Sequence, residues 1–335
     1  MSMAEKTVRI GILGVAHLHA HSYTKELKRL PGVEVAGIAD HDPERAAAEG
    51  VHLGVTAFPD AAALLRADLD GVVICAENVR HRELVEMAAA SRVHVLSEKP
   101  LATTVEDAEA MVRVCRESGT GLYTAFPCRF HPVYARLRQT VQGGEIGRPI
   151  AARTTNQGRN PGSWFINKAL SGGGAVMDHT VHVADLLRDL TAAEPTEVYA
   201  ETSNRIGHGP VEDVALLHIG FSNGLWATLD ASWAMPKSYW TWGNVTVQVT
   251  GTGGVAGMDM FSQNHVVFSD KTMRAGLTNW GDSADGLMLR AFLAAMAGAP
   301  APGPVPLATG EDGLRAVRVV MAAYQSAATR EPVTI

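Results

Sequence analysis

The residues best suited to acid/base chemistry lie in one short segment, which runs from the glycines Gly172–Gly174 to Asp178 and His182. Apolar residues recur at helical intervals after the glycines, which predicts an amphipathic helix. Asp178 and His182 are four residues apart, so they share one face of that helix. A carboxylate beside an imidazole can act as an acid/base pair. The alternative is a solvated helix face, where Asp and His often occur at this spacing.

A lysine at the end of a buried strand is the second candidate. The segment Ser97-Glu98-Lys99-Pro100 follows the apolar run Val93–Leu96 directly, and ligands of open α/β sheets bind at the carboxyl ends of the strands. A cationic Lys99 there would stabilise the alkoxide that develops when a hydroxyl loses its proton. It would also lower the pKa of a neighbouring histidine. The alternative for Lys99 is a surface ion pair with Glu98 or another acid.

The turn after the first apolar run, Val8–Leu13, has part of a dinucleotide-binding pattern. The usual fingerprint, G-x-G-x-x-G, brings a pyrophosphate to a helix N-terminus. Aligned on Gly14, the chain has Ala16 and His19 where the second and third glycines would stand. The motif alone therefore indicates a dinucleotide only weakly.

Asp40 ends the second apolar run, close to where a carboxylate binds the adenosine ribose hydroxyls of the cofactor. Its charge should repel the 2′-phosphate of NADP, so the sequence favours NAD. The alternative for Asp40 is a turn or a helix cap. Asp42, which precedes Pro43, is the better candidate for the cap.

Three histidines, His17, His19 and His21, raise the alternative of a metal site in the same turn. Residues two apart on a helix do not face each other. A metal site would therefore need an extended backbone there, and further ligands from later strands. We expect no metal.

The first part of the chain alternates short apolar runs with amphipathic segments. Such runs are typical of strands buried on both faces of a parallel sheet, and the alternation predicts a doubly wound α/β (Rossmann) domain with right-handed crossovers. We expect strands at Val8–Leu13, Val33–Ala39, Gly71–Cys75, Val93–Leu96 and Leu122–Ala125, and helices at His19–Leu30, Pro43–Glu49, Ala61–Arg66, Arg80–Ala90 and Val105–Glu117.

The pattern changes after about residue 125. A helix over Val133–Val141 and an irregular stretch over Asn156–Gly174 precede the helix with Asp178 and His182. Strand-like runs then follow one another, with Asn-Gly as a hairpin turn between two of them. They are Glu197–Ser203, Val214–Phe221, Leu225–Ser232, Val245–Thr250 and His265–Ser269, and two helices follow at Leu287–Ala297 and Leu314–Ala328. We expect a Rossmann domain over residues 1–125 and, over 126–335, an α+β domain with a large, mainly antiparallel open sheet.

The composition is that of an ordinary globular protein, with 46% hydrophobic and 19% charged residues over 335 positions. The formal net charge of −6 does not indicate a nucleic-acid-binding surface, and no apolar stretch approaches the length of a membrane span. The three cysteines form no CxxC pair, which is typical of reduced thiols, and the first residues show no signal-peptide pattern. We expect a cytoplasmic protein without nucleic-acid or membrane partners.

Taken in order along the chain, these motifs resemble those of the GFO/IDH/MocA oxidoreductases. That family has an E-K-P motif after its fifth strand, here Glu98-Lys99-Pro100, and a G-G-G-x-x-x-D-x-x-x-H helix, here Gly172 to His182. Glu77-Asn78-Val79-Arg80-His81 and Arg129-Phe130-His131-Pro132 also match, so the resemblance covers nearly the whole chain. It implies a nicotinamide-dependent oxidoreductase with Lys99, Asp178 and His182 as catalytic residues.

The resemblance also implies a cofactor site for NAD, with NADP less expected. Its residues would be Gly14, Ala16, His17, Asp40, His41, Glu77, Asn78, His81, Glu98 and Lys99. The chain departs from the family pattern in its eroded glycine fingerprint. It also has Glu77 where the family commonly has proline, which would place a charge near the nicotinamide edge.

Polar and aromatic residues of the second domain are the candidates for substrate recognition. They are Arg153, Asn156, Arg159, Trp164, His179 and Trp240. Tryptophan and arginine suit a polyhydroxylated ligand, through stacking and forked hydrogen bonds. The alternative is that the indoles pack against the sheet or form a subunit contact.

We therefore expect an NAD-dependent dehydrogenase that acts on a hydroxyl of a sugar, polyol or inositol-like molecule. His182 would be the general base, and Asp178 would orient the hydroxyl or the imidazole. Three alternatives stay open: an NAD-binding regulator without turnover, a metal-dependent hydrolase, and a lyase or epimerase that uses NAD for transient oxidation. Because an open sheet leaves a face that needs cover, we also expect a homodimer or homotetramer.

Overall fold

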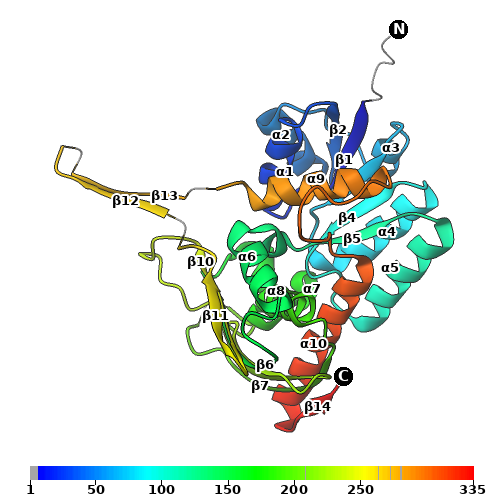
Figure 1. The fold of residues 1–335 in the computed structure, drawn as a ribbon. Coiled ribbons are helices and arrows are strands. Elements are labelled where there is room, and N and C mark those ends of the chain that lie inside the picture. Colours follow the sequence, from blue (N-terminus) through cyan, green and yellow to red (C-terminus); the bar gives the residue numbers. More distant parts are fainter. Residues whose placement is uncertain (1–6, 208, 263, 272, 280) are drawn as a thin grey trace. The chain divides into compact units, whose positions relative to one another are not determined.

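The computed structural model describes residues 7–207, 209–262, 264–271, 273–279 and 281–335. The chain forms two compact units that interleave in sequence (Figure 1). The first unit comprises the described part of Met1–Pro127, with Ala169–Gly172 and Asp285–Val317. The second comprises the described parts of Cys128–Lys168, Gly173–Ala284 and Arg318–Ile335.

A parallel sheet of five strands forms the centre of the first unit. Its strands are β1 (Val8–Leu13), β2 (Val33–Ala39), β3 (Gly71–Ile74), β4 (His94–Glu98) and β5 (Leu122–Ala125). The spatial order is β2-β1-β3-β4-β5, so the winding reverses after β2 and α1 lies on the opposite face from α4 and α5. Ile10, Ile12 and Val73 are fully buried, as expected of strands covered on both faces.

Helices cover both faces of this sheet. They are α1 (His19–Leu27), α2 (Pro43–Leu53), α3 (Ala61–Leu65), the 3-10 turn η1 (Asn78–Arg80), α4 (His81–Ala90), α5 (Val105–Ser118), α9 (Ala284–Met296) and the first part of α10 (Gly310–Thr329). The carboxylate of Asp42 accepts hydrogen bonds from the N–H groups of Glu44 and Arg45, and Pro43 opens α2. Asp42 is therefore the N-cap, as predicted.

A mixed sheet of seven strands forms the second unit, in the order β11-β10-β6-β9-β8-β7-β14. Its strands are β6 (Pro149–Gly158), β7 (Pro195–Ser203), β8 (Val214–Phe221), β9 (Trp226–Asp230), β10 (Gly243–Gly251), β11 (Gly254–Asp259) and β14 (Val333–Thr334). Neighbouring strands are antiparallel except β6 and β9, which are parallel. The strands β12 (Asn264–Ser269) and β13 (Arg274–Asn279) form a separate antiparallel pair.

One face of the seven-stranded sheet is covered by the helix α8 (Ala175–Thr191), which packs against β6, β7 and β8. The helical segments between β5 and α8 are η2 (Pro127–Phe130), α6 (Pro132–Gln142), η3 (Ser163–Ile166) and α7 (Lys168–Ser171). Along β8 the buried Leu217 and Ile219 alternate with Leu216, which is 55% exposed. Trp226 of β9 is 61% exposed. The face opposite α8 is therefore open and partly apolar within this chain.

The predicted fold class, a Rossmann sheet followed by a mainly antiparallel sheet, is confirmed. The strand β6 differs from our expectation, because we predicted that the chain is irregular from Asn156 onward. Its buried side chains alternate as in any strand, but they are small or polar: Ala152, Thr154, Asn156 and Gly158. An apolar alternation is therefore absent from the sequence of β6.

The predicted division at residue 125 lies beside the first change of unit, at Pro127. The return of Asp285–Val317 to the first unit was not predicted. The ring of Phe292, in α9, lies edge-on against Tyr123 of β5, with 5.8 Å between the ring centroids. Burial of this apolar helix against the parallel sheet accounts for the return.

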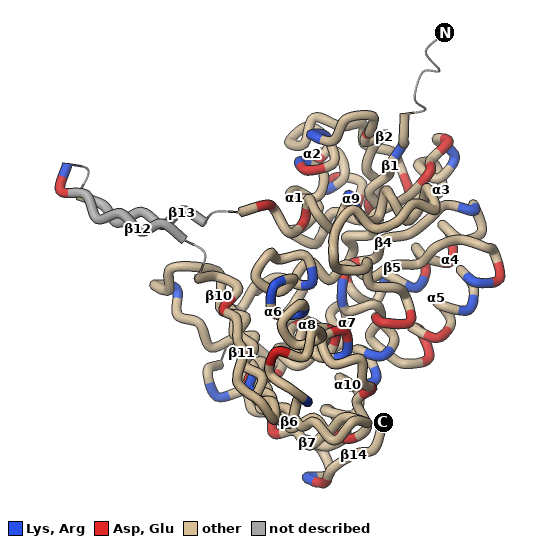
Figure 2. The backbone as a smooth tube through the Cα atoms, viewed as in Figure 1, with Lys and Arg blue, Asp and Glu red and all other residues tan. Residues whose placement is uncertain are grey.

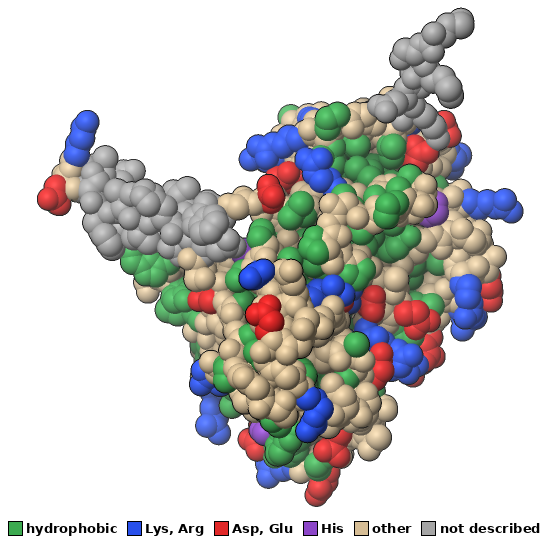
Figure 3. Space-filling model, in the orientation of Figure 1, with side chains coloured by type: hydrophobic (Ala, Val, Ile, Leu, Met, Phe, Trp, Pro, Cys, Tyr) green, Lys and Arg blue, Asp and Glu red, His purple; other side chains and the backbone are tan. Residues whose placement is uncertain are grey.

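Charges and apolar side chains are mixed over the surface. Figure 2 shows basic and acidic positions interspersed along α4 and α5, and Figure 3 shows apolar side chains scattered among polar ones on the face it draws. This mixture is usual for a globular protein. Within the described residues, no helix combines the length and the apolar character that crossing a membrane requires.

Candidate active site

The turn between β1 and α1 is built for close approach at one glycine. Gly14 has φ +80°, and a Cβ there would lie 2.5 Å from the backbone of Ala76, so no other residue fits. The next N–H, that of Val15, donates to Oδ2 of Asp40 at 2.7 Å. This bond ties the turn to the end of β2.

Asp40 is an anion fixed at this turn. Its side chain is buried, which by itself raises the pKa of the carboxyl group. Hydrogen bonds from Arg45 and from the N–H groups of Asp42 and Val15 outweigh burial and lower the pKa of Asp40 below its usual value. The residue predicted to meet the ribose hydroxyls is therefore ionised at neutral pH.

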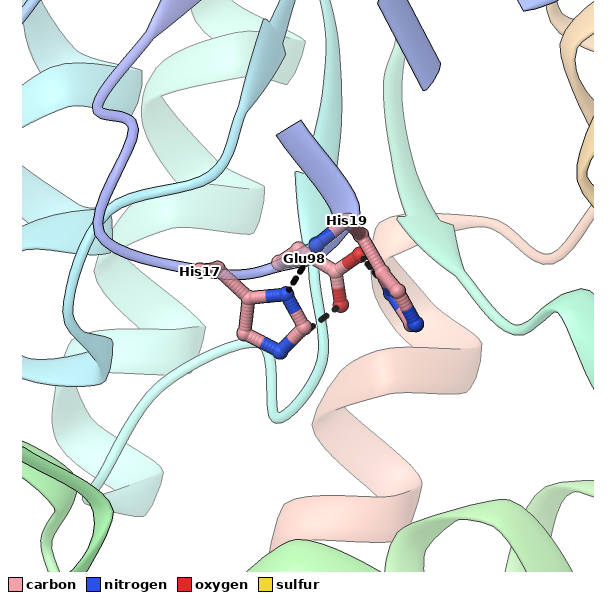
Figure 4. A group of neighbouring side chains, drawn as sticks. All are labelled: His17, His19 and Glu98. Atoms are coloured by element: carbon pink, nitrogen blue, oxygen red, sulfur yellow. Dashed lines mark hydrogen bonds and ion pairs between the residues drawn. The ribbon is translucent and has the colours of Figure 1, made fainter. Parts of the chain in front are cut away.

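The histidines of the turn meet the end of β4 (Figure 4). Nδ1 of His19 lies 2.8 Å from Oε1 of Glu98, and Nε2 of His17 lies 4.0 Å from Oε2 of the same carboxylate. Nδ1 of His17 accepts the N–H of His19 at 3.2 Å, and so lies at the start of α1. Glu98 is fully buried, and His17 is nearly so. A buried carboxylate thus lies against two imidazoles.

The charges in this cluster support one another. Burial disfavours the charged forms of both Glu98 and His19. The positive groups His17, His19 and Lys99 nevertheless hold the pKa of Glu98 well below its usual range, and Glu98 raises the pKa of His19. We conclude that Glu98 and His19 form a charged pair.

The geometry required for a metal site is present here, although we expected it to be absent. His17 precedes α1 rather than lying on it, and a later strand supplies Glu98, so that one possible ligand atom from each of His17, His19 and Glu98 lies within 4.8 Å of the others. The His19–Glu98 hydrogen bond gives the carboxylate a partner without a metal. The absence of a metal stays a prediction.

Lys99 follows Glu98 directly and is 6% exposed. Its backbone N–H donates to Oε2 of Glu98 at 3.0 Å, and the Lys99–Pro100 peptide bond is cis. Asn78 donates from Nδ2 to the carbonyl of Ser171 at 2.8 Å, while no donor among the described residues reaches its Oδ1. Lys99 thus follows β4, and Asn78, whose Oδ1 has no donor in the described part of the chain, follows the adjacent strand β3.

His81 does not fit the predicted role in cofactor binding. It is fully buried, and its ring nitrogens contact the carbonyls of Ala76, Pro100 and Leu101 at 3.0–3.3 Å. Burial lowers the pKa of this imidazole. His81 joins the end of β3 to the segment after Lys99 and is not exposed to a ligand.

Glu77, predicted to bring a charge near the nicotinamide edge, pairs with Arg45. Its Oε1 accepts a hydrogen bond from Nη2 of Arg45 at 3.0 Å, and the same nitrogen donates to Oδ1 of Asp40 at 2.7 Å. His41 lies between the two acids, 3.2 Å from Asp40 and 3.7 Å from Glu77. Glu77 thus belongs with the residue predicted to bind the ribose.

The residues of the first unit fit the adenosine part of NAD. A cavity of about 200 Å³ is lined by Gly14, Asp40, His41, Ala76 and Arg80, among others. A glycine turn that admits the backbone closely and an ionised acid after β2 are what a bound dinucleotide requires. The site therefore fits despite the missing second and third glycines.

In the second unit, the glycines before α8 are required by packing. A Cβ on Gly173 would lie 1.8 Å from the hydroxyl of Tyr324, and one on Gly174 would lie 2.1 Å from the carbonyl of Glu212. Oε1 of Glu212 accepts hydrogen bonds from the N–H groups of Gly174 and Val176 and from the Tyr324 hydroxyl, at 2.7–3.1 Å. Protein atoms therefore fill the space beside these two glycines.

Asp178 and His182 lie on α8, 8% and 7% exposed, so neither is on a solvated face. Nε1 of Trp233 donates to Oδ2 of Asp178 at 3.0 Å, and Nε2 of His179 lies 3.2 Å from the same oxygen. Sequence reasoning missed Trp233. The sequence places Trp233 just after a strand, but this position does not identify Asp178 as its hydrogen-bond partner.

The candidate substrate residues do not all gather in one place. Asn156 is buried on β6, and its Nδ2 donates to the carbonyl of His179 at 3.0 Å. The ring of Trp242 lies edge-on to His179, with 5.4 Å between the centroids. Among the described residues, no hydrogen-bond partner reaches Oδ1 of Asn156 or Nδ1 of His179. Both side chains are buried, so these unbonded atoms do not face solvent.

The other four candidates differ in placement. Arg159 donates from Nη2 to the carbonyl of Tyr239. Trp164 is buried and stacks on Phe165, with 3.9 Å between the ring centroids. This arrangement favours the alternative in which the indole packs against the sheet. Trp240 is 56% exposed. Arg153 is exposed and lies three residues from Asn156 on β6, hence on the opposite face of the sheet.

Comparisons with known proteins agree with this geometry. Residues 8–126 match a family model described as "Oxidoreductase family, NAD-binding Rossmann fold", and residues 134–256 match "GFO/IDH/MocA C-terminal domain". The 1,5-anhydro-D-fructose reductase of Ensifer adhaerens is 31% identical over 343 residues, which cover 98% of each chain. The myo-inositol 2-dehydrogenase of Thermotoga maritima is 27% identical over 332 residues, or 95% of this chain and 96% of the relative.

Among solved structures, GenD2 from gentamicin A biosynthesis, in complex with NAD, superposes with a TM-score of 0.88. It is 23% identical, and the match covers 100% of this chain and 98% of GenD2, so this likeness is one of fold. The sequence relatives and both family models also identify the family. This chain belongs to the GFO/IDH/MocA family of oxidoreductases, and its first unit is an NAD-binding Rossmann domain.

Proposed function

We propose that this chain is an NAD-dependent dehydrogenase that acts on a hydroxyl-bearing carbon of a sugar, polyol or inositol-like molecule. The observation that carries the proposal is the buried Asp178 on α8, held by Trp233 and four residues before His182. It occurs in a chain of this family that also has Lys99. A chain that only bound NAD as a regulator would have no need of this set.

The proposed roles follow from the chemistry of each group. Lys99 would stabilise the negative charge that develops on the substrate oxygen. His182 would take the hydroxyl proton, because an imidazole has an ordinary pKa near neutrality. Asp178 would orient the hydroxyl or the imidazole from the position that Trp233 fixes. The nicotinamide, when bound, supplies the exchange of a hydride.

The substrate class is supported by Asn156 and His179. Oδ1 of Asn156 can accept a hydroxyl proton, and Nδ1 of His179 can donate or accept, depending on its tautomer. Trp242 beside His179 offers an aromatic surface of the kind that packs against sugar rings. The relatives named above reduce anhydrofructose or oxidise myo-inositol according to their names, and both substrates are polyhydroxylated.

The test is a panel of sugars, polyols and inositols, incubated with the purified protein and NAD, with NADP in parallel. We expect absorbance at the NADH wavelength to rise with at least one of them. Substrate consumption without net NADH would instead identify a lyase or epimerase. If the protein binds NAD and no compound is consumed, the proposal fails and the regulator alternative stands.

We further propose that the chain works in the cytoplasm as a homodimer or homotetramer. Leu216 and Trp226, which are more than half exposed on the open sheet face, support a subunit contact there. Light scattering coupled to gel filtration checks the oligomeric state. A monomer at micromolar concentration would contradict this part of the proposal.

A further inference from the structure

One arginine nitrogen of the first unit bridges two carboxylates. Nη2 of Arg45 donates to Oδ1 of Asp40 at 2.7 Å and to Oε1 of Glu77 at 3.0 Å. The two acids come from different strands, because Asp40 follows β2 and Glu77 follows β3. Arg45 thus joins the ends of these two strands.

Glu77 is nearly inaccessible, and its second oxygen faces more positive charge. The residue is 3% exposed. Its Oε2 lies 3.6 Å from Nε of Arg80 and 3.7 Å from Nδ1 of His41, and no hydrogen-bond donor within the described residues reaches it. A carboxylate is costly to bury unless cations pair with it. Glu77 therefore depends on Arg45 and Arg80.

A local structural role does not explain this carboxylate. Glu77 stands at the N-cap of η1, but its side chain makes no capping hydrogen bond there. Instead it points toward Arg45, 32 residues earlier in the chain. Its neighbours Ala76 and Arg80 line the cavity of about 200 Å³ together with Asp40 and His41. Glu77 is thus placed to act on the charge of that cavity.

Four charged side chains face one another at this end of the cavity, and two further acids, Asp60 and Glu83, also line it. Asp40 and Glu77 are two acids, and Arg45 and Arg80 are two permanent cations. Removal of Glu77 would leave Nη2 of Arg45 with Asp40 as its acceptor and would free one of its donors. It would also take away the nearer acid of Arg80, whose other acid is Glu83 at 4.0 Å. Arginines with free donors beside a ribose are what recognises the 2′-phosphate of NADP.

We propose that Glu77 is a specificity-determining residue for the cofactor. It engages Arg45 and Arg80 and so prevents them from binding a 2′-phosphate, while Asp40 accepts the ribose hydroxyls. The selection of NAD is then shared between two acids from different strands. This inference rests on the NAD-binding domain and not on the proposed substrate.

The test measures cofactor binding without any substrate. Dissociation constants for NADH and NADPH are obtained from nicotinamide fluorescence, at one fixed ionic strength because charge interactions are screened by salt. The variants are Glu77→Gln, Glu77→Asp and Glu77→Gln combined with Arg45→Gln. The matched control is Glu44→Gln, which removes one negative charge from an exposed position beside Arg45 in α2.

We expect Glu77→Gln to shift the ratio of NADPH to NADH affinity at least tenfold toward NADPH. Glu44→Gln and Glu77→Asp should shift it less than threefold, and Arg45→Gln should abolish the gain in the double variant. An unchanged ratio in Glu77→Gln, or an equal loss of both cofactors, would overturn the proposal. So would a gain that persists without Arg45.

A second measurement keeps the proposal testable if Glu77→Gln does not fold. Arg45→Gln alone leaves two acids with one fewer cation, so NADPH affinity relative to NADH should fall at least fivefold. No change in that ratio would overturn the proposal. Because no turnover is measured, failure here is distinct from failure of the proposed dehydrogenase activity.

Discussion

Nε1 of Trp233 donates a hydrogen bond to Oδ2 of Asp178 at 3.0 Å, from a side chain that is fully buried. Asp178 lies on α8, and Trp233 follows β9, so helix and sheet fix the carboxylate together. A carboxylate held in this way keeps one orientation, which is what a group that positions a hydroxyl or an imidazole requires. Trp233 is thus a positioning residue for the predicted acid/base pair.

The substitution Trp233→Phe tests this role. It removes the donor but keeps an aromatic ring, and we expect kcat to fall about tenfold because Asp178 loses its fixed orientation. NADH affinity should stay within about twofold of the starting value. The control is Trp226→Phe on the open face of the sheet, where the side chain is 61% exposed. Equal kcat values for the two variants would exclude the positioning role.

The substitution Lys99→Ala separates binding from chemistry. The charge of Lys99 acts mainly on the developing alkoxide, so its loss should lower kcat at least about 100-fold. NAD binding, measured by titration, should change little. A variant that retains full kcat would contradict the assignment of Lys99 as a catalytic residue.

The His19–Glu98 pair predicts a pH dependence of stability. The pKa of His19 is raised in the folded protein, so its stabilising effect is fully present below the unfolded pKa, about 6.5. This effect is lost as the pH rises through the folded pKa. Between pH 6 and pH 9 the free energy of unfolding should fall more in the wild type than in His19→Gln.

Urea unfolding at the two pH values, without cofactor, measures this difference. At pH 6 the variant should be less stable by roughly 3 kcal/mol, because it removes the nearest cation and the side-chain hydrogen bond from the buried Glu98. Equal pH dependence in both proteins would show that His19 carries no charge. The exposed His21, at 45% side-chain exposure beside Glu49, supplies the control His21→Gln.

Metal removal tests the alternative use of the same cluster. If the His19–Glu98 ion pair alone satisfies the carboxylate, dialysis against a chelator should leave the melting temperature and the activity unchanged. A metal held by His17, His19 and Glu98 would contribute to stability, so its removal would lower the melting temperature. Elemental analysis of the protein before dialysis completes the test.

The packing requirement for the glycines before α8 can be tested by substitution. The change Gly173→Ala places a Cβ within 1.8 Å of the Tyr324 hydroxyl, and such overpacking costs about 1–3 kcal/mol. A melting temperature lowered by several degrees is expected. The control is Gly303→Ala, because a Cβ at Gly303 has no neighbour within 4 Å. A neutral Gly173→Ala would contradict the requirement for glycine at this position.

The sequence was sufficient for the features that depend on local pattern. Runs of branched apolar residues predicted the five strands of the first unit, and Asp42-Pro43 predicted the start of α2. The E-K-P segment, whose Glu98 is the last residue of β4, was found from its place at a strand end. Each of these features is encoded within a few neighbouring residues.

What the sequence did not reveal depends on partners distant in the chain. The strand β6 was missed because its inward side chains, such as Asn156, are polar and bond to α8. Trp233 and the pairing of Glu77 with Arg45 were missed because the partners, Asp178 for Trp233 and Arg45 for Glu77, are 55 and 32 residues away. Hydrophobic periodicity carries no signal for such pairs.

The cap on α8 has a consequence for the order of folding. Gly174 precedes Asp178 and His182, the proposed acid/base pair. The Glu212 carboxylate that accepts its N–H lies 38 residues later, and the Tyr324 hydroxyl that donates to this carboxylate lies 112 residues beyond Glu212. During synthesis the ribosome releases Asp178 and His182 long before either partner, and contacts of such high sequence separation form slowly. A nascent or truncated chain therefore carries Lys99, Asp178 and His182 while the start of α8 is still without its hydrogen-bond partners.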